Sequence, residues 1–126
     1  MLTKPERLEY NFFKKVHKII RKDNITKEDL IKIYKYFKKF CDKLHLDEID
    51  LLRKGEVFLG RYCDSIDYKD LDKVYDVLDK CFYNSIELTS PVSLVMIATI
   101  TKLALAEFEG KEIINKETDN NENDDL

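Results

Sequence analysis

The residues most often used for catalysis or metal binding are few in this chain and far apart. There are two histidines, His17 and His45, and three cysteines, Cys41, Cys63 and Cys81. Each cysteine falls on the apolar side of an expected helix, where a thiol acts as a small core residue. An odd number of widely spaced cysteines is typical of a reduced protein rather than a disulfide scaffold. We therefore predict a cytoplasmic protein without a catalytic thiol.

Other catalytic and metal-binding patterns are missing from the sequence. It contains no phosphate-binding loop, dinucleotide-binding turn, zinc-protease helix, nucleophile elbow or CxxC pair. Asp72, Asp76 and Asp79 share one side of an expected helix, but three carboxylates are fewer ligands than Mg²⁺ or Ca²⁺ takes. We interpret them as a solvated acidic face. We expect no enzyme, no catalytic residue, no metal and no cofactor.

Basic residues follow the polar side of the first two expected helices, with tyrosines among them. They are Arg7, Tyr10, Lys14, Lys18 and Arg21 in the first helix, and Lys32, Lys35, Tyr36, Lys39 and Lys43 in the second. The short connection between the two helices indicates an antiparallel hairpin, in which these residues would share one surface. We call this set of ten residues the basic face.

Charge is divided unequally between the two parts of the chain. Residues 1–45 contain 13 Lys and Arg against 6 Asp and Glu, a net charge of +7, and residues 46–126 contain 9 against 19, a net charge of −10. The sum is the −3 of the whole chain. Such segregation favours a partner of opposite charge on one of the two surfaces.

The elements that carry these residues are predicted to be helices. A chain of 126 residues with 3 Gly and 2 Pro is one domain in length and has few of the turn residues of a β protein. Apolar residues recur at helical spacing in five segments. Capping residues place the beginnings of these segments at Thr3, Thr26, Asp47, Asp67 and Ser90.

Two glycines interrupt the third segment, residues 47–64. Gly55 and Gly60 each cost about 1 kcal/mol relative to Ala inside a helix. Either the helix backbone approaches a neighbour closely at these positions, or the segment is two short helices. We favour close packing.

The fifth segment is apolar on almost every side from Val92 to Phe108, with Lys102 and Glu107 as interruptions. A helix of this kind must be covered on all sides, and it is too short and too charged for a membrane span. We expect it at the centre of the bundle, ending at Gly110. Alternatively, residues 92–108 provide a face for a homo-oligomer.

The predicted fold is all-α: a compact bundle of about five helices around an apolar C-terminal helix. Residues 1–110 form a single helical domain, and residues 111–126 form an acidic, disordered tail. The leading functional prediction is a non-catalytic protein-binding module, such as a small regulator, inhibitor or adaptor. RNA or DNA binding by the basic face is the first alternative, and a homodimeric interaction protein is the second.

Overall fold

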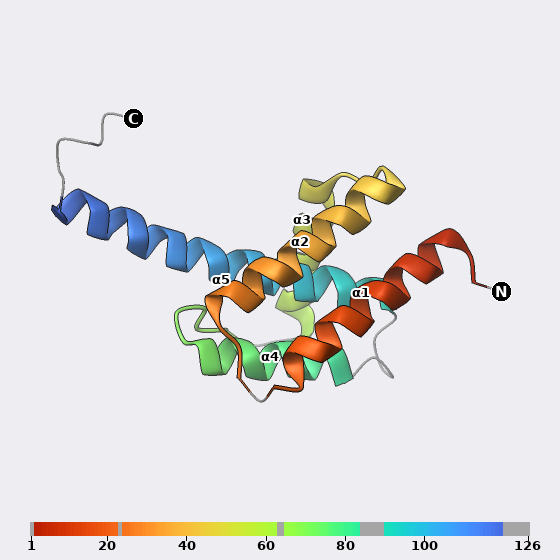
Figure 1. The fold of residues 1–126 in the computed structure, drawn as a ribbon, viewed down its shortest axis with the longest axis horizontal. Coiled ribbons are helices and arrows are strands. Elements are labelled where there is room, and N and C mark those ends of the chain that lie inside the picture. The colour runs from red at the N-terminus through yellow and green to blue at the C-terminus, as the bar shows by residue number, and fades with distance from the viewer. Residues whose placement is uncertain (1, 23, 63–64, 84–89, 120–126) are drawn as a thin grey trace.

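Five helices make up the computed structural model, and no strand occurs among the residues it describes, 2–22, 24–62, 65–83 and 90–119. The helices are α1 (Lys4–Ile20), α2 (Lys27–Leu44), α3 (Glu48–Tyr62), α4 (Leu71–Tyr83) and α5 (Ser90–Asp119). Figure 1 shows α1 and α2 side by side across one face of α5, with α4 below them. The prediction of an all-α bundle is confirmed.

The first two helices begin where the capping residues predict. The Thr3 hydroxyl accepts the Glu6 backbone N–H, and the Glu6 carboxylate accepts the Thr3 N–H in return. Thr26 and Asp29 form the same reciprocal pair at the start of α2. His45 ends α2 in a left-handed conformation with φ 55°, and its backbone N–H donates to Asp42. Local sequence therefore sets these ends without help from the rest of the fold.

The predicted capping residue of the fourth helix is wrong by three residues. α4 begins at Leu71, and the Asp70 carboxylate caps it by accepting the Asp72 N–H at 3.0 Å. Asp67 instead stabilises the preceding turn, since its side chain accepts the Lys69 N–H and its carbonyl accepts the Asp70 N–H. Two Asp residues three positions apart are both good caps, and only the later one precedes an apolar stripe. The predicted end at Asn84 and Ser85 lies outside the described residues.

The predicted end of the fifth helix is also wrong. α5 continues through Gly110 to Asp119, and its C-terminal part projects beyond the other helices (Figure 1). A glycine costs only about 1 kcal/mol inside a helix, and no proline follows it in the sequence. Residues 111–119 thus belong to α5, residues 120–126 lie outside the described part, and disorder of the segment 111–126 stays a prediction.

The apolar half of α5 is the centre of the bundle. It contacts α1, α2, α3 and α4, and residues 93–101 are all buried. The prediction that this segment is too short and too charged for a membrane span is wrong, because Pro91–Glu109 is long and apolar enough to cross a membrane. However, 61% of its most apolar window is buried inside the fold, as in the core helix of a soluble protein. Few side chains between residues 92 and 108 are left exposed, among them Lys102. Val92, Leu103 and Phe108 are half-buried, and a homo-oligomer through residues 92–108 stays a prediction.

The third segment is one continuous helix, and Gly55 shows why it contains a glycine. A Cβ atom at Gly55 would lie 1.9 Å from Thr99 Oγ1 and 2.6 Å from the Val95 carbonyl oxygen of α5. The Thr99 hydroxyl donates to the Val95 carbonyl at 2.7 Å and lies 3.3 Å from the Leu52 carbonyl of α3. The predicted close packing is therefore confirmed at Gly55. It is wrong at Gly60, where nothing lies within 4 Å of an added Cβ.

Ile49 is an apolar residue of α3 that does not join the core. Its side chain is 60% exposed, whereas Gly55 and Leu59 are buried against the bundle. The close approach at Gly55 sets the face of α3 that meets α5, and this face leaves the first turn of α3 partly outside the core.

Asp29 is a charged residue within the buried face of α2. It is only 4% exposed, and its carboxylate accepts hydrogen bonds from Lys22 Nζ at 2.9 and 3.0 Å and from the Thr26 N–H at 3.0 Å. Burial by itself would raise the pKa of Asp29, but these hydrogen bonds and the Lys22 charge outweigh burial and lower it. The pair fixes the turn between α1 and α2.

The contact between α3 and α5 predicts opposite effects for two substitutions to Ala. Gly55→Ala should lower the free energy of unfolding by about 2 kcal/mol or more, because the methyl group overlaps backbone and a buried hydroxyl. Gly60→Ala should leave stability unchanged or raise it by up to about 1 kcal/mol, because the helix gains propensity without a clash. Urea titration followed by circular dichroism measures both. Equal stability of the two variants would contradict the close approach.

The Asp29 cluster predicts a pH-dependent contribution to stability. Asp29→Asn should lower the free energy of unfolding by about 1–2 kcal/mol at pH 7, because the charged hydrogen bonds are lost. The pKa of Asp29 is lowered in the folded state, so this stabilisation is complete above the usual value of about 4 and disappears as the pH falls through the folded pKa. Urea titrations from pH 2.5 to 7 should show the two proteins converging at acid pH.

The matched control for this substitution is Asp42→Asn on the exposed side of α2. It removes the same charge without breaking a buried pair, so its stability should stay within about 0.5 kcal/mol of the wild type. A difference between wild type and Asp29→Asn that does not vary with pH would show that the carboxylate contributes through packing and not through its charge.

Candidate functional site

The two basic helices form the hairpin that their short connection predicts. α1 and α2 pack against each other and run in opposite directions (Figure 1). Their apolar stripes face inward, so Phe12, Val16, Ile33 and Phe37 are buried. The polar sides of both helices are consequently left on the surface.

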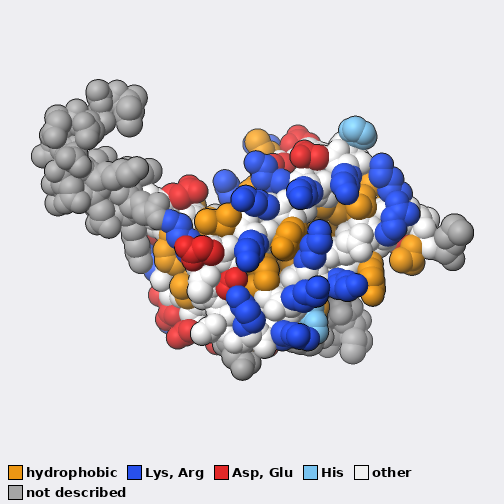
Figure 2. Space-filling model, in the orientation of Figure 1, with side chains coloured by type: hydrophobic (Ala, Val, Ile, Leu, Met, Phe, Trp, Pro, Cys, Tyr) orange, Lys and Arg blue, Asp and Glu red, His pale blue; other side chains and the backbone are white. Residues whose placement is uncertain are grey.

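The structure brings the predicted basic face together as one surface. All eight Lys and Arg residues of the set are exposed, Tyr10 is 59% exposed, and Tyr36 is half-buried. Figure 2 shows Lys and Arg side chains gathered over the α1–α2 hairpin, with few acidic side chains between them. The heptad-like spacing within each helix and the packing of the two helices together produce this arrangement.

Acidic side chains of the described residues do not pair with the charges of the basic face. None of its eight Lys and Arg residues has an ion-pair partner within the described part of the chain. The described ion pairs lie elsewhere, between Lys22 and Asp29 and between Lys54 and Asp50. Like charges at this spacing repel mildly, so an acidic ligand would relieve a cost that the free protein carries.

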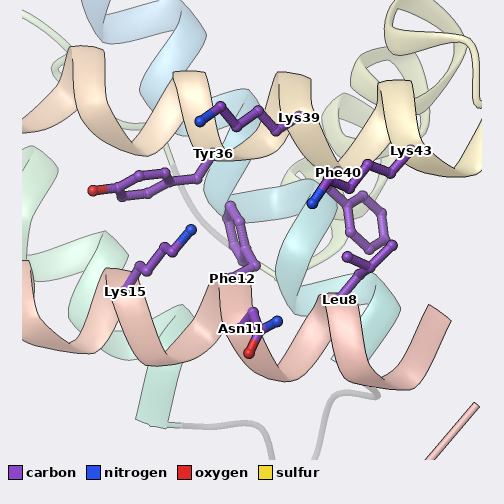
Figure 3. Close-up of a pocket in the computed structure, with 8 residues that line it drawn as sticks. All are labelled: Leu8, Asn11, Phe12, Lys15, Tyr36, Lys39, Phe40 and Lys43. Carbon is purple, nitrogen blue, oxygen red and sulfur yellow. The ribbon is translucent and has the colours of Figure 1, made fainter. Parts of the chain in front are cut away.

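A shallow pocket of about 60 Å³ lies between the two helices on this surface. α1 provides Leu8, Asn11, Phe12 and Lys15, and α2 provides Tyr36, Lys39, Phe40 and Lys43 (Figure 3). Aliphatic and aromatic side chains form much of the pocket, while lysines lie around it. An apolar depression surrounded by charge is a common arrangement at protein interfaces.

Lys15 is a member of this surface that the sequence did not identify. Its Nζ lies 4.9 Å from the centre of the Tyr36 ring, within the range of a cation–π contact. Lys15 is the residue after Lys14 of the basic face, and its side chain points toward α2 (Figure 3). Only the register of α1 against α2 pairs it with Tyr36, so helical spacing within one segment does not reveal it.

The acidic residues of α4 are separate from the basic face. Asp72 and Asp76 are exposed, and Asp79 is half-buried. No group of three or more His, Cys, Asp or Glu residues in the described ranges is placed to hold a metal ion. The three carboxylates are a surface feature of the helix that packs beneath α1 and against α5.

The histidines and cysteines do not form a reactive group among the described residues. The His17 ring stacks on Phe82 with centroids 5.4 Å apart, and His45 caps α2. Burial raises the pKa of the Cys41 thiol to about 11, helped by the charges of nearby acidic residues. Cys81 is also buried. Cys63 lies outside the described residues.

Burial predicts that Cys41 reacts slowly with alkylating reagents. A thiol with a pKa of about 11 is almost fully protonated at pH 8, and only the thiolate reacts. We expect iodoacetamide to modify Cys41 at least about a hundredfold more slowly in the native protein than in 6 M urea. Peptide mass spectrometry over time measures the rate. Equal native and unfolded rates would show that Cys41 is accessible.

The chain was also compared with known proteins. Comparison with family models, with curated proteins and with solved structures gave no match. Its function is therefore inferred from the positions, burial and charges of its own residues.

Proposed function

We propose that the protein is a non-catalytic protein-binding module whose basic face binds an acidic surface of a partner protein. The observation that carries this proposal is the exposed row of eight Lys and Arg side chains without ion-pair partners in the described chain. Complementary charge steers such a partner toward the surface and fixes its orientation. The protein would act as a small regulator, inhibitor or adaptor in the reducing cytoplasm, where the buried Cys41 and Cys81 would stay reduced.

The pocket between α1 and α2 supports a protein partner over a phosphate backbone. Leu8, Phe12 and Phe40 offer apolar contact in the middle of the charged surface, and a protein can fill it with an aromatic or aliphatic side chain. Six of the eight basic residues are Lys, whereas Arg makes the better bidentate contact with phosphate and base edges. The net charge of −3 also weakens general attraction to nucleic acid.

RNA or DNA binding is the second candidate, and Tyr10 is the observation that favours it. The Tyr10 ring is 59% exposed among the basic residues of α1. An aromatic ring beside cations can stack on an unpaired base while lysines contact the phosphates.

Reversing two charges at the centre of the basic face tests the proposal. Lys35→Glu/Lys39→Glu should weaken binding of a 20-residue Glu-rich peptide containing one Phe by at least tenfold, because four units of charge change at the contact. Wild-type binding should also weaken as salt rises from 50 to 200 mM, since exposed charges are screened. Fluorescence anisotropy of labelled peptide measures both effects.

Lys38→Glu/Lys73→Glu is the control, because it changes the net charge equally at exposed sites outside the basic face. It should bind the peptide within threefold of the wild type. A 20-nucleotide single-stranded RNA and a 20-base-pair DNA are measured in parallel. Tighter binding of either nucleic acid than of the peptide, lost in Lys35→Glu/Lys39→Glu, would favour the second candidate. No binding of any probe would remove both.

A further inference from the structure

A second, larger pocket lies at the end of the bundle where α1, α3 and α5 begin and α2 ends. Its volume is about 360 Å³, within the range of binding pockets for ligands and anchor side chains. Eight of its nine lining residues are apolar, including Leu44 of α2, Leu51 of α3 and Leu94 of α5, and the ninth is Glu9 of α1. This pocket is distinct from the shallow one on the basic face, although Phe40 contributes to both.

Glu9 is an unusual residue for such a place. One carboxylate oxygen, Oε2, is buried and accepts no hydrogen bond from the described residues. Burial raises the pKa of Glu9, and the charge of Glu6 raises it further. A buried carboxylate without a donor costs free energy, and no helix cap or internal ion pair in the described chain requires an acid at this position.

One apolar side chain that lines the pocket is also exposed. Leu46 lines it while remaining 41% exposed. The apolar lining therefore reaches the surface at the rim, where a protein segment that enters the pocket can also cover Leu46.

We propose that this pocket is a docking site for a partner protein segment that inserts a large apolar side chain and places an Arg or Lys against Glu9. The cation would donate to the buried oxygen and neutralise its charge where water is largely excluded, so the pair would be stronger than one at an exposed site. A segment without the cation would bury Glu9 further and leave it unpaired. Glu9 thus selects partners by penalising those without a positive charge.

This proposal goes beyond the function proposed for the basic face and does not depend on it. The basic face would bind carboxylates of its partner, whereas the Glu9 pocket would bind a cation that lies beside apolar side chains. The two surfaces therefore accept different segments, and each is tested by its own substitutions.

Selection from a random library of displayed 16-residue peptides tests the docking site on the full-length protein. The selection uses the Lys35→Glu/Lys39→Glu variant, so that acidic peptides specific to the basic face are not recovered. We expect the selected peptides to combine large apolar residues with at least one Arg or Lys. A parallel selection on the same variant with Glu9→Gln should lose the enrichment of basic residues.

Individual selected peptides are then measured on single variants by fluorescence anisotropy. Glu9→Gln should weaken binding at least tenfold and leave the unfolding midpoint unchanged or higher, since an unpaired buried charge is removed. Leu46→Ser at the exposed rim should weaken binding about fivefold. Glu28→Gln is the matched control, because it removes one exposed acidic charge at the opposite end of α2, and it should have no effect.

Three outcomes would overturn the proposal. The first is a set of selected peptides without basic residues, or peptides that bind Glu9→Gln as tightly as the wild type. The second is saturation of the pocket by octylamine with the same dependence on Glu9 while no peptide binds, which would indicate a small amphiphilic ligand. The third is a dimer in light scattering that Glu9→Gln dissociates, which would assign the pocket to a second copy of the chain.

Discussion

The bundle depends on the covering of α5, a helix with apolar side chains on almost every side. Residues 93–101 are all buried, so four other helices must each present an apolar stripe to them. α3 approaches closely, because Gly55 allows its backbone to reach Thr99 and the Val95 carbonyl. Thr99 and Thr101 enter this core without an unpaired hydroxyl, since each donates to a carbonyl four residues earlier in α5.

The inner faces of α1 and α2 pack against α5, so their outer faces lie on the surface and can carry charge. The interior needs no Lys or Arg from these helices, and the structure supports the basic face without neutralising it. Two polar groups that enter the interior are paired: Asp29 with Lys22, and Tyr34 with Glu48 of α3, to which its hydroxyl donates. Burial and the Glu48 charge both raise the pKa of Tyr34. The charge of Asp29 is thus compensated locally, while the basic face accumulates charge at the surface.

Coverage of α5 is incomplete at its N-terminal end, and the Glu9 pocket lies there. Leu94 and Val95 are buried by the helices around them, yet they also line this pocket. α3 turns Ile49 away from the core at the same end. A carboxylate in this setting is neither a cap nor part of an ion pair in the described chain. The molecule therefore carries two surfaces of different chemistry, one basic and one apolar with a single carboxylate.

Local chemistry in the sequence determined the helices, the starts of α1 and α2 and the central position of α5, because capping and apolar periodicity act within a few residues. It also placed the basic residues on one side of each helix. Three features depend on the tertiary structure. They are the choice of Asp70 over Asp67 as the cap of α4, the continuation of α5 past Gly110 and the contact of Lys15 with Tyr36. In each of them the sequence offers competing local options, or a neighbouring helix provides the contact. The pocket around Glu9 comes from four segments distant in sequence. Only their packing decides that one oxygen of this carboxylate is buried beside apolar side chains.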